Sequence, residues 1–303
     1  MRNAPALFRF VAQLIAVGVL VGGCGQTPPF KDPGADPGAG LAQDVHGRTL
    51  PAPAGAAGEP VAGGEPVAAG PRGNSQLTAG PNPATLPTGS IYRNPANGRQ
   101  EVIVEDSRRT AVLIGDSQSE PANAWPRQAL AAAGYKVFFC GLGGTGFVAA
   151  NGSTGNYLNA LRRGDWKLPY GEPPLVVMQG GGNDAARGAT DEQIASNAEQ
   201  LIGTLRERYP SSKFAMIGTL ARGANDGGGR RSQVDALLGT VAAKQAIPFV
   251  SVGDWLTRYK LTGMLADGVH LNAQGHNELG TLLGQRFKAL GLEAKEPRTP
   301  SGS

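Results

Sequence analysis

Short apolar runs alternate with helix-like segments along the part of the chain that follows residue 98. Five runs have the length of a buried strand and lie at 111–114, 136–140, 175–178, 214–218 and 249–252. Helix-like segments lie at 125–133, 191–209, 232–246 and 273–290, several of them with cap or turn residues at an end. Strands that alternate with helices indicate a parallel sheet covered by helices on both faces. We therefore predict an α/β fold, a three-layer α/β/α sandwich around a central parallel sheet of about five strands.

The residues before this pattern have a different composition. Residues 25–98 consist mostly of Pro, Gly, Ala and scattered polar residues, as in "KDPGADPGAG" and "VAGGEPVAAG", with no apolar period. Such a stretch cannot bury enough apolar surface to offset its conformational entropy. We predict a disordered tether at 25–98, a folded domain at 99–292 and a disordered tail at 293–303. The alternating run "EVIVE" at 101–105 predicts one small additional strand.

The N-terminus has the pattern of an export signal. Arg2 and Arg9 flank the start of an apolar run at 10–21, which has signal-peptide length and is short for a membrane-spanning helix. The following "LVGGC" resembles a bacterial lipobox in which Cys24 is lipidated and becomes the new N-terminus. We therefore expect residues 1–24 to be a signal peptide, and the mature chain to be an exported lipoprotein anchored to the outer face of a membrane through Cys24. The alternative is an ordinary signal peptide, and a secreted protein, with a chance cysteine.

Charge and cysteine content exclude several classes of protein. The formal net charge is +4 over 303 residues, and no cluster of Lys and Arg is interleaved with aromatic residues. This pattern gives no indication of nucleic-acid binding. There are two cysteines, so a lipidated Cys24 leaves Cys140 without a disulfide partner. We expect Cys140 to be a buried residue at a strand end and not a thiol nucleophile.

Candidate chemistry gathers after the predicted strands, where open parallel sheets bind their ligands. Ser117 follows the first strand in Gly-Asp-Ser and could be a nucleophile or an ordinary turn residue. Asp267 and His270 are three residues apart, so the carboxylate could orient the imidazole as a base, or both could cap the last helix. Asn183 follows the third strand and could donate to an oxyanion or form an Asx turn. His276 falls within the last helical pattern and is expected to be structural.

The loop after the second strand, "GLGGTG" at 141–146, contains a G-x-G-x-x-G string. This string could indicate a dinucleotide-binding loop. However, it follows the second strand and not the first, no acidic residue closes the next strand, and no clear helix opens at Gly146. We therefore favour a loop whose backbone approaches a substrate closely, and expect no cofactor.

A nucleophile, a glycine loop, an asparagine and Asp-x-x-His, in this order, resemble the SGNH hydrolases, also called GDSL esterases. The resemblance covers about 110–290 and implies a flavodoxin-like SGNH hydrolase fold and an acyl-enzyme mechanism without a metal. It implies Ser117 as the nucleophile, with His270 as base and Asp267 as its orienting group. It implies an oxyanion hole from the N–H of Ser117, the N–H of Gly144 (or Gly143 in another register) and the side chain of Asn183. Gln118 stands where the family commonly has leucine.

Three neighbouring polar residues are expected to be structural rather than chemical. Ser119 lies beyond the Gly-Asp-Ser turn, and Asp116 and Asp184 are expected to hold loops by hydrogen bonds.

The predicted function is a serine esterase that hydrolyses short acyl, mainly acetyl, esters. Three tryptophans near predicted loops, Trp125, Trp166 and Trp255, suit contact with sugar faces, so the expected partner is a small acylated substrate such as an acetylated glycan of the cell envelope or an extracellular carbohydrate. Two alternatives remain open at this point. One is an acyltransferase that passes the acyl group to a glycan acceptor, and the other is a non-catalytic, surface-tethered binding module.

Overall fold

The computed structural model describes residues 81–295. The predicted signal peptide, Cys24 and most of the predicted tether lie outside the described residues and stay predictions. Within the described part, no helix combines the length and apolar character needed to cross a membrane.

Five parallel strands form the central sheet in the order β4-β3-β5-β6-β7. Their bounds are β3 Thr110–Gly115, β4 Lys136–Gly141, β5 Leu175–Gln179, β6 Lys213–Ile217 and β7 Phe249–Val250. Relative to the first strand of this sheet the order is 2-1-3-4-5, which is the flavodoxin-like order. The predicted α/β/α fold class is therefore confirmed, although β7 is shorter than the apolar run at 249–252.

Successive side chains of the inner strands point to opposite faces of the sheet, so the core consists of two apolar clusters. In β3, Ala111 and Leu113 point into one apolar cluster while Val112 and Ile114 point into the other. All four residues are fully buried. A strand covered on both faces must be apolar at every position, which is why β3 reads as a continuous hydrophobic run.

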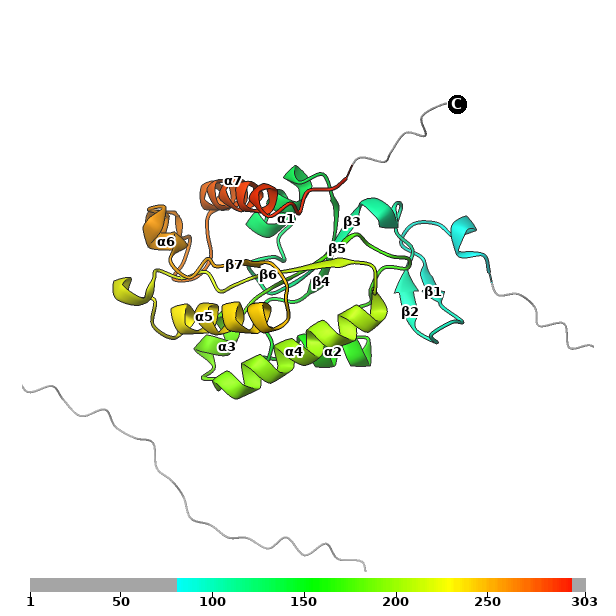
Figure 1. Cartoon of the computed structure of the whole chain (residues 1–303), viewed down its shortest axis with the longest axis horizontal. Coiled ribbons are helices and arrows are strands. Elements are labelled where there is room, and N and C mark those ends of the chain that lie inside the picture. The colour runs from blue at the N-terminus through cyan, green and yellow to red at the C-terminus, as the bar shows by residue number, and fades with distance from the viewer. Residues whose placement is uncertain (1–80, 296–303) are drawn as a thin grey trace, which may run out of the picture. The chain divides into compact units, whose positions relative to one another are not determined.

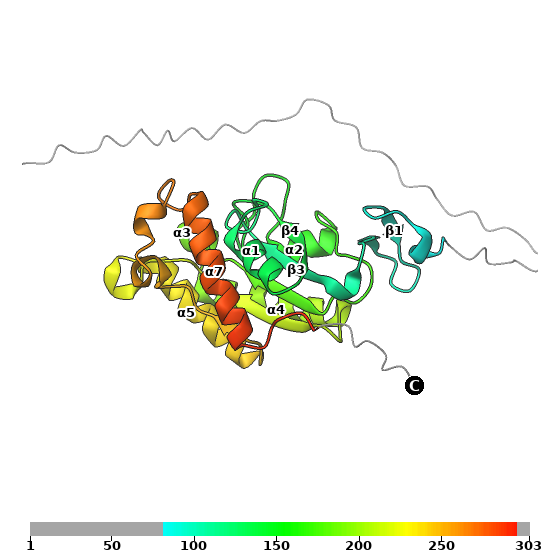
Figure 2. The same ribbon diagram turned by 90° about the horizontal axis from the view of Figure 1, so that it is seen from above.

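Helices cover both faces of the sheet (Figure 1). The bounds are α1 Trp125–Ala132, α2 Tyr157–Arg163, α3 Gly182–Ala186, α4 Asp191–Arg208, α5 Gly229–Lys244, α6 Trp255–Arg258 and α7 Ala273–Ala289. Helices α1 and α7 lie on one face, and α2, α4 and α5 lie on the other (Figures 1 and 2). The predicted helices correspond to α1, α4, α5 and α7, whereas α2, α3 and α6 are too short to give a clear periodic pattern.

Contact between α1 and α7 brings the end of the chain back to its first strand–helix unit. A Cβ on Gly280 would lie 3.0 Å from Cβ of Gln128 and 3.4 Å from the carbonyl oxygen of Trp125. A glycine at this position therefore lets the two helices approach closely. Phe287 and Leu283 of α7 are fully buried in the same cluster.

A small hairpin precedes the sheet and corrects the predicted domain boundary. Strand β1, Ile91–Arg93, pairs antiparallel with β2, Gln100–Val102. The predicted tether at 25–98 includes residues 91–93, which form a strand, so the predicted boundary at residue 99 is wrong. The predicted strand at 101–105 is present in shortened form as β2. A three-residue strand that pairs locally has too few apolar positions to be read from its period.

A buried ion pair joins the hairpin to α4. Glu101 of β2 accepts hydrogen bonds from the side-chain amides of Asn94 and Asn97, at 3.0 and 2.9 Å. The Nη2 atom of Arg208 lies 2.7 Å from the Glu101 carboxylate, and the side chains of Arg208 and Glu101 are only 10% and 1% exposed. Removing one partner of such a pair leaves an uncompensated buried charge, so the hairpin and α4 depend on each other.

We expect Glu101→Gln to lower the free energy of unfolding by about 3–5 kcal/mol, because it leaves Arg208 buried without its counter-charge. Urea denaturation followed by circular dichroism measures this change. The control is Glu105→Gln, which removes a carboxylate from an exposed pair with Lys136 and should cost less than about 1 kcal/mol. Equal effects of the two substitutions would contradict the structural role of the hairpin.

Candidate active site

Three side chains that are far apart in the sequence form a continuous hydrogen-bonded chain. Ser117 follows the carboxyl end of β3, and its Oγ lies 2.8 Å from Nε2 of His270. On the other side of the imidazole, Nδ1 of His270 lies 2.8 Å from Oδ2 of Asp267. With the Nδ1 proton donated to the carboxylate, Nε2 is free to accept the hydroxyl proton of Ser117. This alignment has the geometry of an activated serine nucleophile.

Asp267 is held as a carboxylate by its own loop. Its Oδ1 accepts the backbone N–H groups of His270 and Val269, both at 2.6 Å. Hydrogen bonds from the backbone and then the side chain of His270, together with the backbone of Val269, hold the pKa of Asp267 well below its usual range. The side chains of His270 and Asp267 are 42% and 58% exposed. The site is therefore open to solvent along the loop that carries the imidazole.

Four N–H groups at this end of the sheet could donate to an oxyanion: the backbone N–H groups of Ser117, Gly143 and Gly144, and the side-chain amide of Asn183. The N–H of Gly143 donates to Oε2 of Glu120 at 2.8 Å, whereas among residues 81–295 the N–H groups of Ser117 and Gly144 have no acceptor. This difference favours Gly144 over Gly143 as a backbone donor. The amide of Asn183, in the first turn of α3, donates to the carbonyl of Thr145 at 2.9 Å. The same nitrogen lies 3.5 Å from Oδ2 of Asp116, so the amide joins the glycine loop to the turn that carries Ser117.

The glycine loop is folded around a buried carboxylate. Asp184 is fully buried and accepts the backbone N–H groups of Phe147, Val148 and Ala149 at 2.8–2.9 Å. A Cβ on Gly146 would lie 2.5 Å from an oxygen of Asp184, so this position requires glycine. The expectation that Asp184 holds a loop is confirmed.

Within the part of the chain that the structure describes, no group of three or more His, Cys, Asp or Glu side chains is arranged to hold a metal ion.

A model of the "GDSL-like Lipase/Acylhydrolase family" matches residues 107–277, which is more than half of the chain. The chain belongs to the GDSL-like lipase/acylhydrolase family. It is therefore a member of a family of carboxylic ester hydrolases. The matched segment contains Ser117, Gly144, Asn183, Asp267 and His270.

Individual relatives share only a small fraction of identical residues with this chain. A multidomain esterase from Ruminococcus flavefaciens is 29% identical over 134 residues, which is 43% of this chain and 17% of that protein. The chain thus spans about one sixth of the length of this curated relative. A carbohydrate acetylesterase from Sinorhizobium meliloti is 20% identical with a TM-score of 0.45, covering 60% of this chain and 100% of its own. A family two carbohydrate esterase from Cellvibrio japonicus is 12% identical with a TM-score of 0.47, covering 64% of each chain.

Gln118 stands where the family commonly has leucine. It connects the turn that carries Ser117 to the loop that carries Asp267 and His270. Its side chain is 3% exposed, and its Nε2 donates to the carbonyl of Val269 at 3.0 Å. Its Oε1 accepts the indole N–H of Trp125 at 3.3 Å. Val269 lies between Asp267 and His270, so Gln118 ties their exposed loop to the turn that carries Ser117. The unusual residue type was visible in the sequence, but its partner 151 residues away was not.

Asp116 is buried beneath the nucleophile turn. Its Oδ1 accepts the N–H of Gln118 at 2.9 Å, and the amide of Gln179, with its nitrogen turned inward, donates to Asp116 and to Ser119. Burial raises the pKa of Asp116 from 3.8 to about 6, while the N–H of Gln118 and the charge of Arg231 act in the opposite direction. Ser119 is fully buried in this network, so the expectation that Asp116 and Ser119 are structural is confirmed.

The remaining candidates have structural positions. His276 lies in α7, is 7% exposed, and its Nδ1 accepts the N–H of Trp125 at 3.3 Å. Cys140 is buried at the end of β4, and burial raises the pKa of its thiol. Trp125 and Trp255 are only 0% and 2% exposed. The expectation that these two tryptophans present faces to a sugar is therefore wrong, because both are part of the core between α1, α6 and α7.

We expect Gln118→Leu to lower kcat for p-nitrophenyl acetate about tenfold with little change in KM, because the imidazole loop loses its tie to the Ser117 turn. Steady-state kinetics and a thermal melt measure this effect and the integrity of the fold. Gln200→Leu, on the exposed side of α4, serves as the control and should leave both parameters unchanged. An unaltered kcat in Gln118→Leu would show that the tie does not position the loop.

Stability should depend on pH through Asp116. Its pKa is about 6 in the folded chain and near 3.8 in the unfolded one. Its contribution to stability is therefore fully present below about pH 4 and is lost as the pH rises through about 6, a change of about 3 kcal/mol. We expect the unfolding free energy of the wild type, relative to Asp116→Asn, to fall by that amount between pH 4 and pH 7. A difference that stays constant with pH would contradict the raised pKa of the buried Asp116 carboxyl.

Proposed function

We propose that this chain is a serine esterase that hydrolyses short acyl esters, above all acetyl esters, at Ser117. The observation that carries the proposal is the alignment of Ser117 Oγ, the imidazole of His270 and the Asp267 carboxylate, with 2.8 Å at each of the two contacts. Membership of the ester-hydrolase family supports the same reaction.

In the proposed mechanism Ser117 Oγ attacks the ester carbonyl carbon while Nε2 of His270 takes the hydroxyl proton. The Asp267 carboxylate keeps the Nδ1 proton in place and stabilises the imidazolium that forms. Collapse of the tetrahedral intermediate breaks the bond to the alcohol, which receives the proton from His270. Water then attacks the acyl-enzyme with His270 again as base, and releases the carboxylic acid and free Ser117.

The negative charge of the tetrahedral intermediate requires donors that are already in place. We assign this role to the N–H of Ser117, the N–H of Gly144 and the side chain of Asn183. The two backbone donors are supported by their lack of an acceptor among the described residues. Asn183 is supported by its bond to Thr145, which fixes the amide beside the glycine loop. Fixed donors stabilise an oxyanion without the cost of reorganising at the moment of reaction.

The substrate is proposed to be a small acyl group on a polar, uncharged carrier, such as an acetylated carbohydrate. The exposed His270 and Asp267 leave room for a large solvated alcohol. The carboxylates of Asp267, on the imidazole loop, and of Glu120, at the glycine loop, would repel an anionic carrier at the ester itself. If residues 1–24 direct export and Cys24 is lipidated, the carrier would be a glycan at the cell surface.

We expect a fluorophosphonate probe to modify wild-type protein and Ser119→Ala at Ser117, and not to modify Ser117→Ala. Asn183→Ala should keep its fold and lose about 10²- to 10³-fold in kcat on p-nitrophenyl acetate, because one oxyanion donor is gone. Intact mass spectrometry with peptide mapping and steady-state kinetics measure these outcomes. Modification of Ser117→Ala, or wild-type turnover by that variant, would refute the nucleophile. A wild-type chain that neither reacts with the probe nor hydrolyses acetyl esters would favour the binding-module alternative.

A further inference from the structure

A cavity of about 370 Å³ lies away from Ser117, on the side of the sheet covered by α2 and α4. It is lined by Arg99 and the start of β2, by the end of α2 with the segment that follows it, and by the last two turns of α4. The N–H of Val102 donates to the carbonyl of Leu168 at 2.9 Å, which seats this segment beside the hairpin that precedes β3. Helix α4 runs from the carboxyl end of β5 to the amino end of β6, so Arg208 at its end lies at the opposite edge of the sheet from Ser117.

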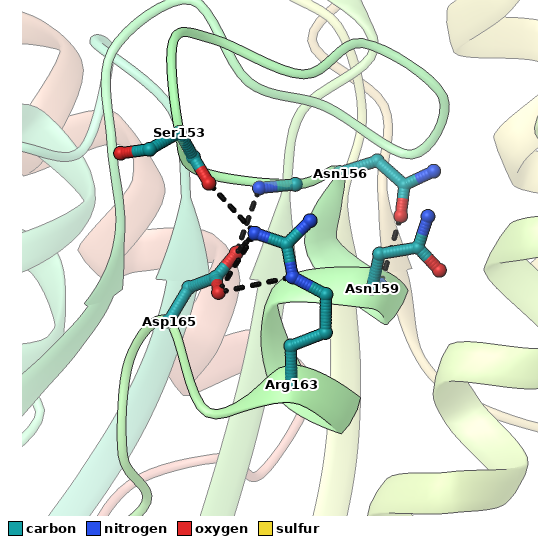
Figure 3. A network of polar contacts seen from close by, with 6 residues as sticks. Ser153, Asn156, Asn159, Arg163 and Asp165 are labelled. Carbon is teal, nitrogen blue, oxygen red and sulfur yellow. Dashed lines mark hydrogen bonds and ion pairs between the residues drawn. The ribbon is translucent and has the colours of Figure 1, made fainter. Parts of the chain in front are cut away.

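The lining of this cavity has an excess of positive charge. Five cationic side chains line it: Arg99, Arg162, Arg163, Lys167 and Arg208. Arg163 is held by Asp165 and by the carbonyl of Ser153 (Figure 3), and Arg208 is paired with Glu101. In the part of the chain that the structure describes, the other three have no carboxylate within 4.0 Å. The one carboxylate in the lining, Glu101, is already taken up by Asn94, Asn97 and Arg208.

Two buried donors without acceptors belong to the same lining. Among the described residues, only two buried side-chain nitrogen or oxygen atoms have no hydrogen-bond partner, namely Nε1 of Trp166 and Nε of Arg208. Both residues line this cavity. A buried donor without an acceptor costs about 1–3 kcal/mol of stability. Two such donors in one lining are therefore unexpected unless a bound ligand accepts their hydrogen bonds. Both atoms donate, and neither can accept.

We propose that this cavity is a second binding site, for a small ligand that carries an oxyanion group, either a carboxylate or a phosphate. The charges of Arg99, Arg162 and Lys167 would attract the oxyanion. The indole Nε1 of Trp166 and Nε of Arg208 each expose less than 1 Å² in this structure, so the lining side chains would shift to let the oxyanion accept from these two N–H groups. Leu161, Leu168 and the indole ring of Trp166 supply apolar contact for the body of the ligand. The volume is within the range of sites for small molecules. This inference does not depend on the proposed esterase mechanism.

Isothermal titration calorimetry on the full chain tests the site with four probes: inorganic phosphate, D-glucose 6-phosphate, D-glucuronate and uncharged D-glucose. We expect at least one anionic probe to bind, D-glucose not to bind, and added salt to weaken the affinity. Binding of the two phosphate probes assigns a phosphate site, and binding of D-glucuronate alone assigns a carboxylate site. Absence of binding by all three anions at millimolar concentration would overturn the proposal, and so would equal binding of D-glucose.

Two variants locate the binding. Arg162→Gln combined with Lys167→Gln should lower the affinity for the anionic probe at least about tenfold. Trp166→Phe, which keeps an aromatic ring but loses the N–H, should lower it about tenfold. The control is Arg109→Gln combined with Lys288→Gln, which removes the same charge from exposed positions outside the cavity and should leave binding unchanged. Hydrolysis of p-nitrophenyl acetate should be the same in all of these variants. Wild-type affinity in the Arg162–Lys167 variant, or equal weakening by the control, would overturn the site.

Discussion

Parallel hydrogen bonding of β3 to β4 on one side and β5 on the other is the constraint on which the rest of the site depends. The paired residues run in register to the ends of the strands, with Gly115 opposite Gly141 and Ile114 opposite Met178. In a parallel sheet, the carboxyl ends of neighbouring strands meet at one edge. Ser117, the glycine loop and Asn183 are therefore neighbours because of backbone pairing alone, before any side chain among them makes contact.

The histidine has no strand of its own and reaches this edge by a different route. His270 lies on the loop before α7, and α7 is held against α1 by close backbone approach at Gly280 and by buried leucine and phenylalanine side chains. Helix α1 in turn begins eight residues after Ser117, at Trp125. The side chain of Gln118 donates to Val269 in the loop that carries His270. The N–H of Trp125 donates to His276 in α7. Packing thus brings the base close, and a few buried hydrogen bonds set its position.

Buried charge is used at two places in this fold, with different consequences. The carboxylate of Glu101 is fully satisfied by two amides and Arg208, and it ties the hairpin to α4. Asp116 is equally buried but forms no ion pair, and the charge of Arg231 only partly offsets the effect of burial, so the pKa of Asp116 is raised and a neutral carboxyl is favoured over a wider pH range. The Asp267 carboxylate beside His270 and the basic lining of the cavity thus lie at opposite edges of the sheet.

The sequence by itself determined the sheet, its main helices and the order of the reactive residues, because apolar periodicity and glycine-rich strand ends are local properties of the chain. It also indicated Ser117, Asn183, Asp267 and His270 as one group, since each follows a strand or precedes the last helix. Only the tertiary structure decided the short hairpin, the bond from the N–H of Gly143 to Glu120, the burial of Trp125 and Trp255, and the link from Gln118 to Val269. The hairpin strands are too short to show a period, and the other features depend on contacts between segments far apart in the chain, which leave no period or spacing that a single sequence could reveal.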